Sequence, residues 1–212
     1  MKTSKTFFIF LFLGILLGGI GIITYGYYNS IPKTVGPTEI DLTFANWEIT
    51  GDGTYRYIED KGTYIEIYDN YNGAYIQATL DVGSIISGNL SIQLKTPVSD
   101  KDGAFRFDLL SGIVSIITIT RDKSSGDWYF RDIDGALTLL IAKDLIWHDI
   151  KISFELDGDD SVVSIWVDDA IEIDAFEFET DLVSIDTLQM RSGKYFIPNL
   201  TQLVLLELIK YN

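Results

Sequence analysis

The sequence has no cysteine and only one histidine. The first absence excludes disulfide bonds and thiolate metal sites, and the second excludes any metal site that needs several histidines. Basic residues are also scarce, since 16 Lys and Arg stand against 31 Asp and Glu, for a formal net charge of −15. Such a surface repels phosphate backbones, so nucleic acid is not an expected partner. The acidity is typical of a soluble surface, or of one that binds divalent cations or a basic surface layer.

Near the N-terminus, an uncharged apolar run extends from Phe7 to Tyr25. At 1.5 Å per residue, a helix over this run is about as long as the roughly 30 Å hydrocarbon core of a bilayer. Lys2 and Lys5 precede the run, so the positive-inside rule places the N-terminus in the cytoplasm. We therefore predict a cytoplasmic stub (1–6), a transmembrane signal-anchor (7–25), a juxtamembrane linker (26–38) and an extracellular domain (39–212).

A cleaved signal peptide is the alternative interpretation of this apolar run. The run is long for the hydrophobic part of a signal peptide, and no Ala-x-Ala-like cleavage site follows it. We therefore expect an uncleaved single-pass anchor in the cell membrane. The linker is short and contains Pro32 and Pro37, so the domain is expected to stay close to the bilayer.

From Glu39 onward, apolar and polar residues alternate with the period of β-strands. The clearest alternation lies at 75–82, 90–95, 150–156 and 163–168, and turn-forming pairs such as Asn72-Gly73 and Asp134-Gly135 separate the runs. Short strands with one apolar face each bury that face by packing two sheets together. The pattern predicts an all-β, two-sheet antiparallel sandwich. Leu203–Ile209 is apolar on both faces, which is typical of a central strand.

The segment from Phe105 to Asp169 carries a resemblance to a known family. Its motifs are Phe-Arg-Phe-Asp at 105–108, the strand at 116–121, Trp-Tyr-Phe-Arg at 128–131, Trp-His-Asp-Ile-Lys-Ile at 147–152 and Ser-Ile-Trp-Val-Asp-Asp at 164–169. Together they resemble the concanavalin A-like lectin/glucanase jelly roll, especially its laminin-G-like branch. The resemblance implies a jelly-roll fold and a core position for Trp147. The family includes lectins, adhesion modules, carbohydrate-binding modules and glycoside hydrolases, so function needs its own argument.

One string matches the E-x-D-x-x-E signature of jelly-roll β-glucanases, namely Glu172 to Glu177. The resemblance implies Glu172 as nucleophile, Glu177 as acid/base and Asp174 as the residue that tunes them. Strict alternation puts Glu177 on the opposite face from the other two, although a β-bulge near Ala175 would bring all three to one side. In those hydrolases the signature comes before the strands that correspond to 147–152 and 164–169. Here it comes after both of them. We therefore expect an ordinary acidic strand and no catalytic residue.

A calcium site is a second hypothesis. Hard oxygen ligands in a flexible loop suit Ca²⁺. The candidate ligands are the carboxylates of an acidic loop and of a nearby strand end: Asp157, Asp159, Asp160, Asp168 and Asp169. Their spacing is not that of an EF-hand, and the alternative is a solvated hairpin turn.

Exposed aromatic rings are the third candidate, because a flat ring covers the apolar face of a pyranose. Trp166 alternates with apolar neighbours and is expected on a polar face. The full set of predicted ligand-binding residues is Trp166, Trp128, Tyr129, Tyr64 and Tyr68. His148 stands beside Trp147 without the motif of a serine hydrolase, so we interpret it as structural.

Taken together, these patterns favour a surface-displayed, non-enzymatic binding or adhesion module for a glycan or a cell-surface protein. The alternatives are a structural component of the cell envelope and a membrane-bound retaining glycoside hydrolase that uses Glu172, Asp174 and Glu177.

Overall fold

The computed structural model describes residues 37–51, 53, 56–69, 75–96, 104–122, 124–182, 184–193 and 199–211. They belong to one compact unit, Pro37–Asn212. The predicted stub, the predicted anchor and most of the predicted linker lie outside the described residues. Within the described part of the chain, no helix is both long and apolar enough to cross a membrane.

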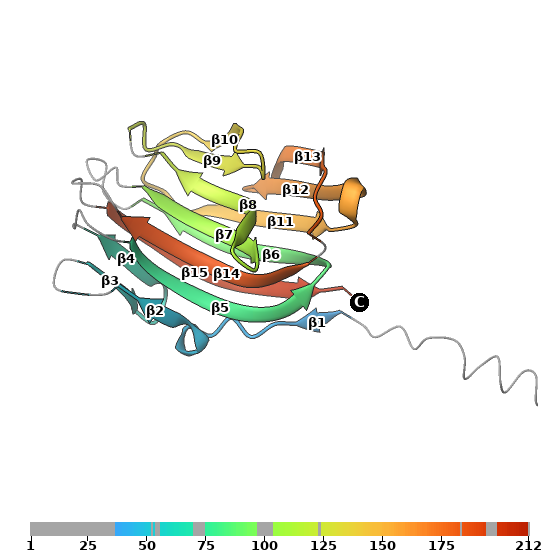
Figure 1. The fold of residues 1–212 in the computed structure, drawn as a ribbon. Coiled ribbons are helices and arrows are strands. Elements are labelled where there is room, and N and C mark those ends of the chain that lie inside the picture. The colour runs from blue at the N-terminus through green and yellow to red at the C-terminus, as the bar shows by residue number, and fades with distance from the viewer. Residues whose placement is uncertain are drawn as a thin grey trace, which may run out of the picture. The chain divides into compact units, whose positions relative to one another are not determined.

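Two antiparallel sheets make up the described chain, as the alternation predicted (Figure 1). The eight-stranded sheet runs in the order β13 (Ala170–Phe178), β12 (Ser161–Val167), β11 (His148–Glu155), β6 (Ser87–Lys95), β15 (Asn199–Lys210), β4 (Ile65–Asp69) and β3 (Arg56–Asp60), and β1 (Thr38–Glu39) pairs with β15. The seven-stranded sheet runs β10 (Leu137–Ile141), β9 (Trp128–Arg131), β8 (Val114–Arg121), β7 (Phe105–Ser111), β14 (Ile185–Gly193), β5 (Tyr75–Ile85) and β2 (Glu48–Thr50). Two 3₁₀ turns, η1 (Phe44–Asn46) and η2 (Gly158–Asp160), complete the elements.

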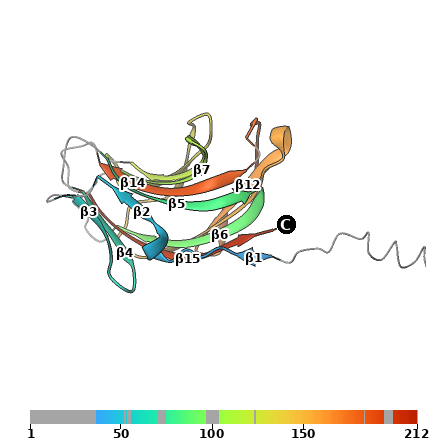
Figure 2. The same cartoon turned by 60° about the horizontal axis from the view of Figure 1, so that its bottom comes forward.

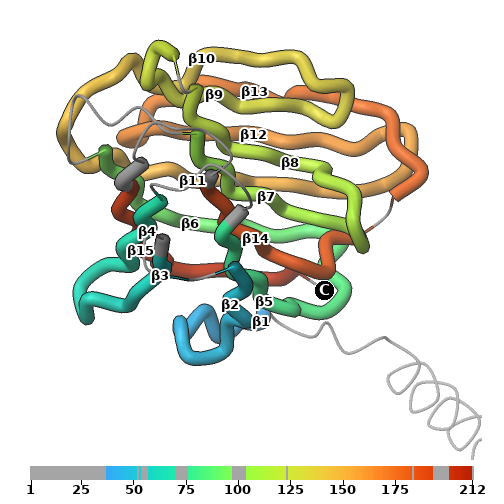
Figure 3. Tube along the Cα trace, turned by 60° about the vertical axis from the view of Figure 1, so that its left-hand side comes forward, coloured from blue at the N-terminus to red at the C-terminus, as the bar shows by residue number. Residues whose placement is uncertain are grey.

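The sandwich is bent along its strands, and the outer face of the seven-stranded sheet lies on the inside of the bend (Figure 2). We call this surface the concave face. The edge strands β10 and β13, one from each sheet, lie at the same side of the molecule (Figure 3). Their sheets are joined there by an edge-to-face contact between Phe130 and Phe176, with ring centroids 5.7 Å apart.

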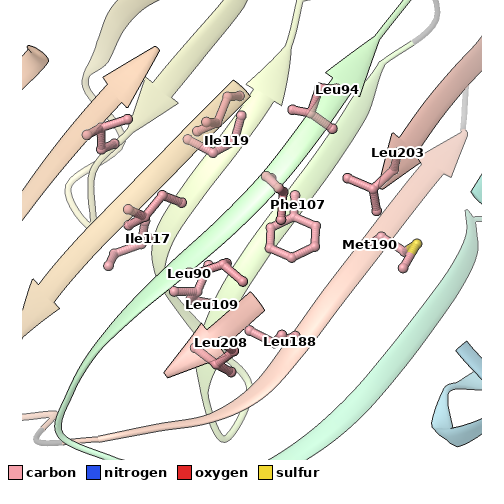
Figure 4. Close-up of a cluster of buried hydrophobic side chains, with 14 of the residues drawn as sticks. Leu90, Leu94, Phe107, Leu109, Ile117, Ile119, Leu188, Met190, Leu203 and Leu208 are labelled. Atoms are coloured by element: carbon pink, nitrogen blue, oxygen red, sulfur yellow. The ribbon is translucent and has the colours of Figure 1, made fainter. Parts of the chain in front are cut away.

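The core lies between the sheets and is built by strand alternation, since successive side chains point to opposite faces. Phe107 and Leu109 of β7 meet Leu90 and Leu94 of β6 across the gap, together with other buried residues labelled in Figure 4. The alternating residues of β5, β6, β11 and β12 that the sequence assigned to the core are all buried. Removing a buried side chain as large as Phe107 would cost about 3–5 kcal/mol.

The structure has a tight turn between β12 and β13 and a bulge in β15. β12 and β13 are joined by a two-residue turn in which Asp168 and Asp169 both have positive φ, as this hairpin type requires. β15 is a central strand, as predicted, but a bulge between Leu205 and Glu207 leaves Leu206 exposed on the outer surface.

Candidate functional site

The concave face carries an ordered set of polar side chains around Arg106. Phe105 and Phe107 point into the core, so strand alternation turns Arg106 and Asp108 outward. In the sheet register, Arg106 pairs with Arg191 of β14 and with Thr120 of β8. The row continues from Thr120 to Tyr129 and from Arg191 to Gln77. This row places guanidinium, hydroxyl, phenol and amide groups side by side across five strands.

Asp108 is the centre of the concave face, and its side chain is fully buried although it points outward. A guanidinium N–H of Arg106 donates to its Oδ1 at 2.7 Å, and Thr118 donates to the same oxygen at 2.5 Å. Arg191 Nε lies 3.3 Å from Oδ2. One buried carboxylate therefore contacts two arginines, by a charge-assisted hydrogen bond from Arg106 and by an ion pair with Arg191 that lacks hydrogen-bond geometry.

Both arginine side chains stay partly exposed despite this contact. Their side chains keep 25% and 24% of their surface exposed, for Arg106 and Arg191 respectively. A guanidinium presents five N–H donors in a fixed planar fork, which suits bidentate binding of a carboxylate. Two cations thus lie beside one aspartate in a strongly acidic chain.

Of the predicted aromatic residues, only Tyr129 lies on the concave face. It is half-buried, and its hydroxyl lies 3.4 Å from Asp127 Oδ2. Trp128, expected to be exposed, is 3% exposed, so that expectation is wrong. Alternation within β9 turns Trp128 into the core, where it packs edge-on against Phe105 and lies 5.7 Å from the buried guanidinium of Arg121.

Trp166 and Tyr68 belong to the eight-stranded sheet, and Tyr64 immediately precedes its strand β4. Trp166 is half-buried on its outer face, because its neighbours Ile165 and Val167 fill the core. Tyr68 packs against Tyr57 with ring centroids 5.3 Å apart, and Tyr57 donates to Glu66 at 2.8 Å. The structure therefore does not gather the five predicted residues into one platform.

Trp147 also differs from its expected core position, because it is only half-buried. Its ring meets Tyr64 at 6.3 Å, and the ammonium of Lys95 lies 5.8 Å from its centroid. Trp147 immediately precedes β11, in which His148 and Ile150 are buried, so alternation turns Trp147 away from the core.

The five aspartates proposed as calcium ligands do not converge. Asp157, Asp159 and Asp160 lie at η2 before β12, whereas Asp168 and Asp169 lie in the turn after it. A strand of this length separates the two groups by about 20 Å. Among the described residues, which include all five, no group of three or more His, Cys, Asp or Glu could hold a metal ion.

Asp168 instead bonds to His148, whose two ring nitrogens both contact carboxylates. His148 Nδ1 lies 2.7 Å from Asp168, and Nε2 lies 2.9 Å from Asp144. Burial lowers the pKa of His148, but the bonds to Asp144 and Asp168 outweigh it and raise the pKa above its ordinary value. For Asp168, burial raises the pKa, yet the Asp149 N–H and His148 lower it overall. This cluster ties the β10–β11 loop to the β12–β13 turn.

The E-x-D-x-x-E string lies on β13, the edge strand of the eight-stranded sheet. A bulge near Ala175, which strict alternation does not include, is present, since the pairing of β13 shifts between Phe176 and Ile173 and Ala175 has a φ of +46°. The Ala175 N–H donates to Ser164 Oγ at 3.0 Å. Glu172, Asp174 and Glu177 are all exposed, and they lie on the sheet opposite to the concave face.

Sequence reasoning missed the concave cluster. The pattern Phe-Arg-Phe-Asp does indicate that Arg106 and Asp108 share a polar face. Nothing in the chain predicts that Arg191 joins them, because the contact arises only when β14 pairs with β7.

Comparisons with known proteins agree on the fold. No protein-family profile matches the sequence, and no curated protein matches it. Among solved structures, a sialidase superposes with a TM-score of 0.66 at 11% identity, over 84% of this chain and 18% of the sialidase chain. The chain thus spans less than a fifth of that protein.

Two further structures match over most of both chains. The Crh5 transglycosylase has a TM-score of 0.55 at 10% identity and covers 84% of this chain and 85% of its own. A carbohydrate esterase from the Shiga toxin-encoding bacteriophage phi24B has a TM-score of 0.53 at 12% identity, over 85% of this chain and 99% of its own. These superpositions show that the described chain has a jelly-roll sandwich fold, the fold that the resemblance implied.

Proposed function

We propose that this chain is a membrane-anchored, extracytoplasmic binding module whose concave face recognises a carboxylate-bearing glycan. The observation that carries the proposal is the buried Asp108, which contacts both Arg106 and Arg191 while about a quarter of each arginine side chain stays exposed, at 25% and 24%. Preorganised arginines lose little conformational entropy on binding, so they favour a planar anionic group over water.

The residues beside the arginines suit the rest of a sugar. Gln77 and Thr120 flank Arg191 and Arg106 in the same row and can bond to hydroxyl groups. Tyr129, next to Thr120, offers a ring on which a pyranose can stack. The strongly acidic remainder of the chain repels an anionic polymer, so binding would be confined to this face.

Location at the cell surface follows from the predicted anchor over 7–25 and its flanking lysines. A short linker would hold the sandwich near the bilayer, where the ligand is a glycan of the envelope. The superposed proteins support a carbohydrate ligand, since two of them are a carbohydrate esterase and a transglycosylase. We propose a non-catalytic role because Glu172, Asp174 and Glu177 stand on an edge strand of the opposite sheet.

Calorimetric titration of the full chain in lipid nanodiscs with hexagalacturonate tests the proposal. Arg106→Lys and Arg191→Lys keep the charge that Asp108 needs but lose the planar fork, so each should weaken binding about tenfold. Lys151→Gln, on the opposite sheet, alters the net charge and should leave the affinity unchanged. The proposal is refuted if the wild-type chain binds hexagalacturonate no better than cellohexaose at the concave face. It is also refuted if the arginine variants bind hexagalacturonate as tightly as wild type does.

A further inference from the structure

A second groove lies on the outer face of the eight-stranded sheet, on the side of the sandwich away from Arg106. It has a volume of about 540 Å³ and is lined in part by Asn89, Ser91, Ser153 and Trp166. Small-molecule sites have volumes of roughly 300–1,000 Å³, so the groove has room for a short oligosaccharide.

The groove has an aromatic floor at one end. Trp166 points outward from β12, and Ile171 of the neighbouring β13 pairs with it and is exposed. The two side chains form an apolar strip that a pyranose ring can cover with its C–H face. Within the described chain the indole N–H of Trp166 has no hydrogen-bond partner, so this donor is available to a ligand.

Polar side chains continue from this strip across the sheet. In register, Trp166 pairs with Lys151, Lys151 with Ser91, and Ser91 with Glu207. Neighbouring strands are about 4.8 Å apart, so a donor or acceptor stands at each such step along the groove. Among the described residues, the hydroxyls of Ser91 and Ser153 bond to no protein group. Such a ladder of small polar groups beside an aromatic ring suits the hydroxyls of a sugar.

The charges of the groove indicate which sugar. Its only cation among the lining residues, Lys151, is already paired with Asp169 at 2.5 Å, and Glu207 adds a further negative charge. An acidic sugar would be repelled here, in contrast to the concave face with its two arginines. We propose that the Trp166 groove is a second glycan site, which takes a neutral sugar and acts independently of the concave face.

The test uses the full chain in lipid nanodiscs and a panel of neutral probes, namely cellohexaose, laminarihexaose and mannohexaose. The wild-type chain should bind at least one of them by calorimetry, and binding should persist when hexagalacturonate is already present. Trp166→Ala should weaken neutral binding by about tenfold or more, and Trp166→Phe should weaken it less because a ring remains.

Trp147→Ala is the matched control, since Trp147 is also half-buried and borders the same sheet outside the groove. It should leave neutral binding unchanged, as should Arg191→Lys. The inference is overturned if no neutral hexaose binds, if Trp166→Ala binds like wild type, or if Arg191→Lys abolishes neutral binding, which would assign both ligands to the concave face. Loss of hexagalacturonate binding alone counts against the proposed function and leaves this groove standing.

Discussion

Each outer face of the sandwich holds an aspartate paired with a cation, but in opposite surroundings. Asp108 is fully buried between Arg106 and Arg191 on the concave face, whereas Asp169 is 84% exposed and contacts Lys151 in solvent. A buried pair that loses one partner leaves a charge without compensation, while an exposed pair is replaced by water. On the concave face the aspartate therefore contacts two arginines from a buried position, whereas on the other face water can replace its contact with Lys151.

The largest effect is expected for Asp108→Asn, which keeps the shape of the side chain and removes its charge. We expect the free energy of unfolding to fall by about 3 kcal/mol, at the low end for a broken buried pair because both arginine side chains are partly exposed. Urea denaturation of the full chain in detergent micelles, followed by tryptophan fluorescence, measures it. A loss below about 1 kcal/mol would show that the arginines do not depend on Asp108.

The His148 cluster predicts that the eight-stranded sheet carries the pH dependence of stability. The folded pKa of His148 is raised above 6.5, so its contribution is complete below that pH and disappears as the pH rises through the folded pKa. The lowered pKa of Asp168 works in the other direction, and its contribution is lost as the pH falls below about 3.8.

His148→Gln should therefore cost about 1–2 kcal/mol at pH 6 and progressively less at alkaline pH. Urea titrations of wild type and variant at pH 6, 7.5 and 9 give the comparison, and Gln93→Ala, which frees Asp149 nearby, serves as a control without a titrating group. An equal loss at all three pH values would exclude a charged imidazole from the cluster.

Alternation in the sequence was sufficient to predict the sandwich and the core side of the segments at 75–82, 90–95, 150–156 and 163–168. It placed Trp166 outward, and the structure contains the bulge near Ala175 that was considered only as an alternative to strict alternation. Alternation gives the face of a residue but not its position along a strand. The calcium hypothesis was wrong for this reason, because it joined carboxylates that lie at opposite ends of β12. Trp128 was expected to be exposed although it shares a face of β9 with Phe130, and the structure buries both rings. The Arg106–Asp108–Arg191 cluster required the pairing of two strands far apart in the chain.

Ala175 gives a smaller test, at the strained edge of the eight-stranded sheet. Its φ of +46° suits glycine better than alanine, so Ala175→Gly should stabilise the chain by about 0.5 kcal/mol after the entropy cost of glycine. Ala170→Gly on the same strand, where φ is not positive, should destabilise it by about 0.5–1 kcal/mol. Urea midpoints measured side by side decide the matter, and a destabilised Ala175→Gly variant would contradict the bulge geometry.

Asp169→Asn is the smallest expected effect and completes the comparison with Asp108→Asn. Asparagine tolerates the positive φ of this turn position, so the substitution removes the ion pair without straining the backbone. Lys151 remains hydrated when it loses its partner, and we expect the free energy of unfolding to change by about 0–0.5 kcal/mol. Because the same substitution is made at both aspartates, the comparison separates the effect of burial from the effect of charge. If Asp169→Asn lowered the free energy of unfolding as much as Asp108→Asn, the exposed pair would stabilise this sandwich as much as the buried one, and the two faces would not differ as the structure indicates.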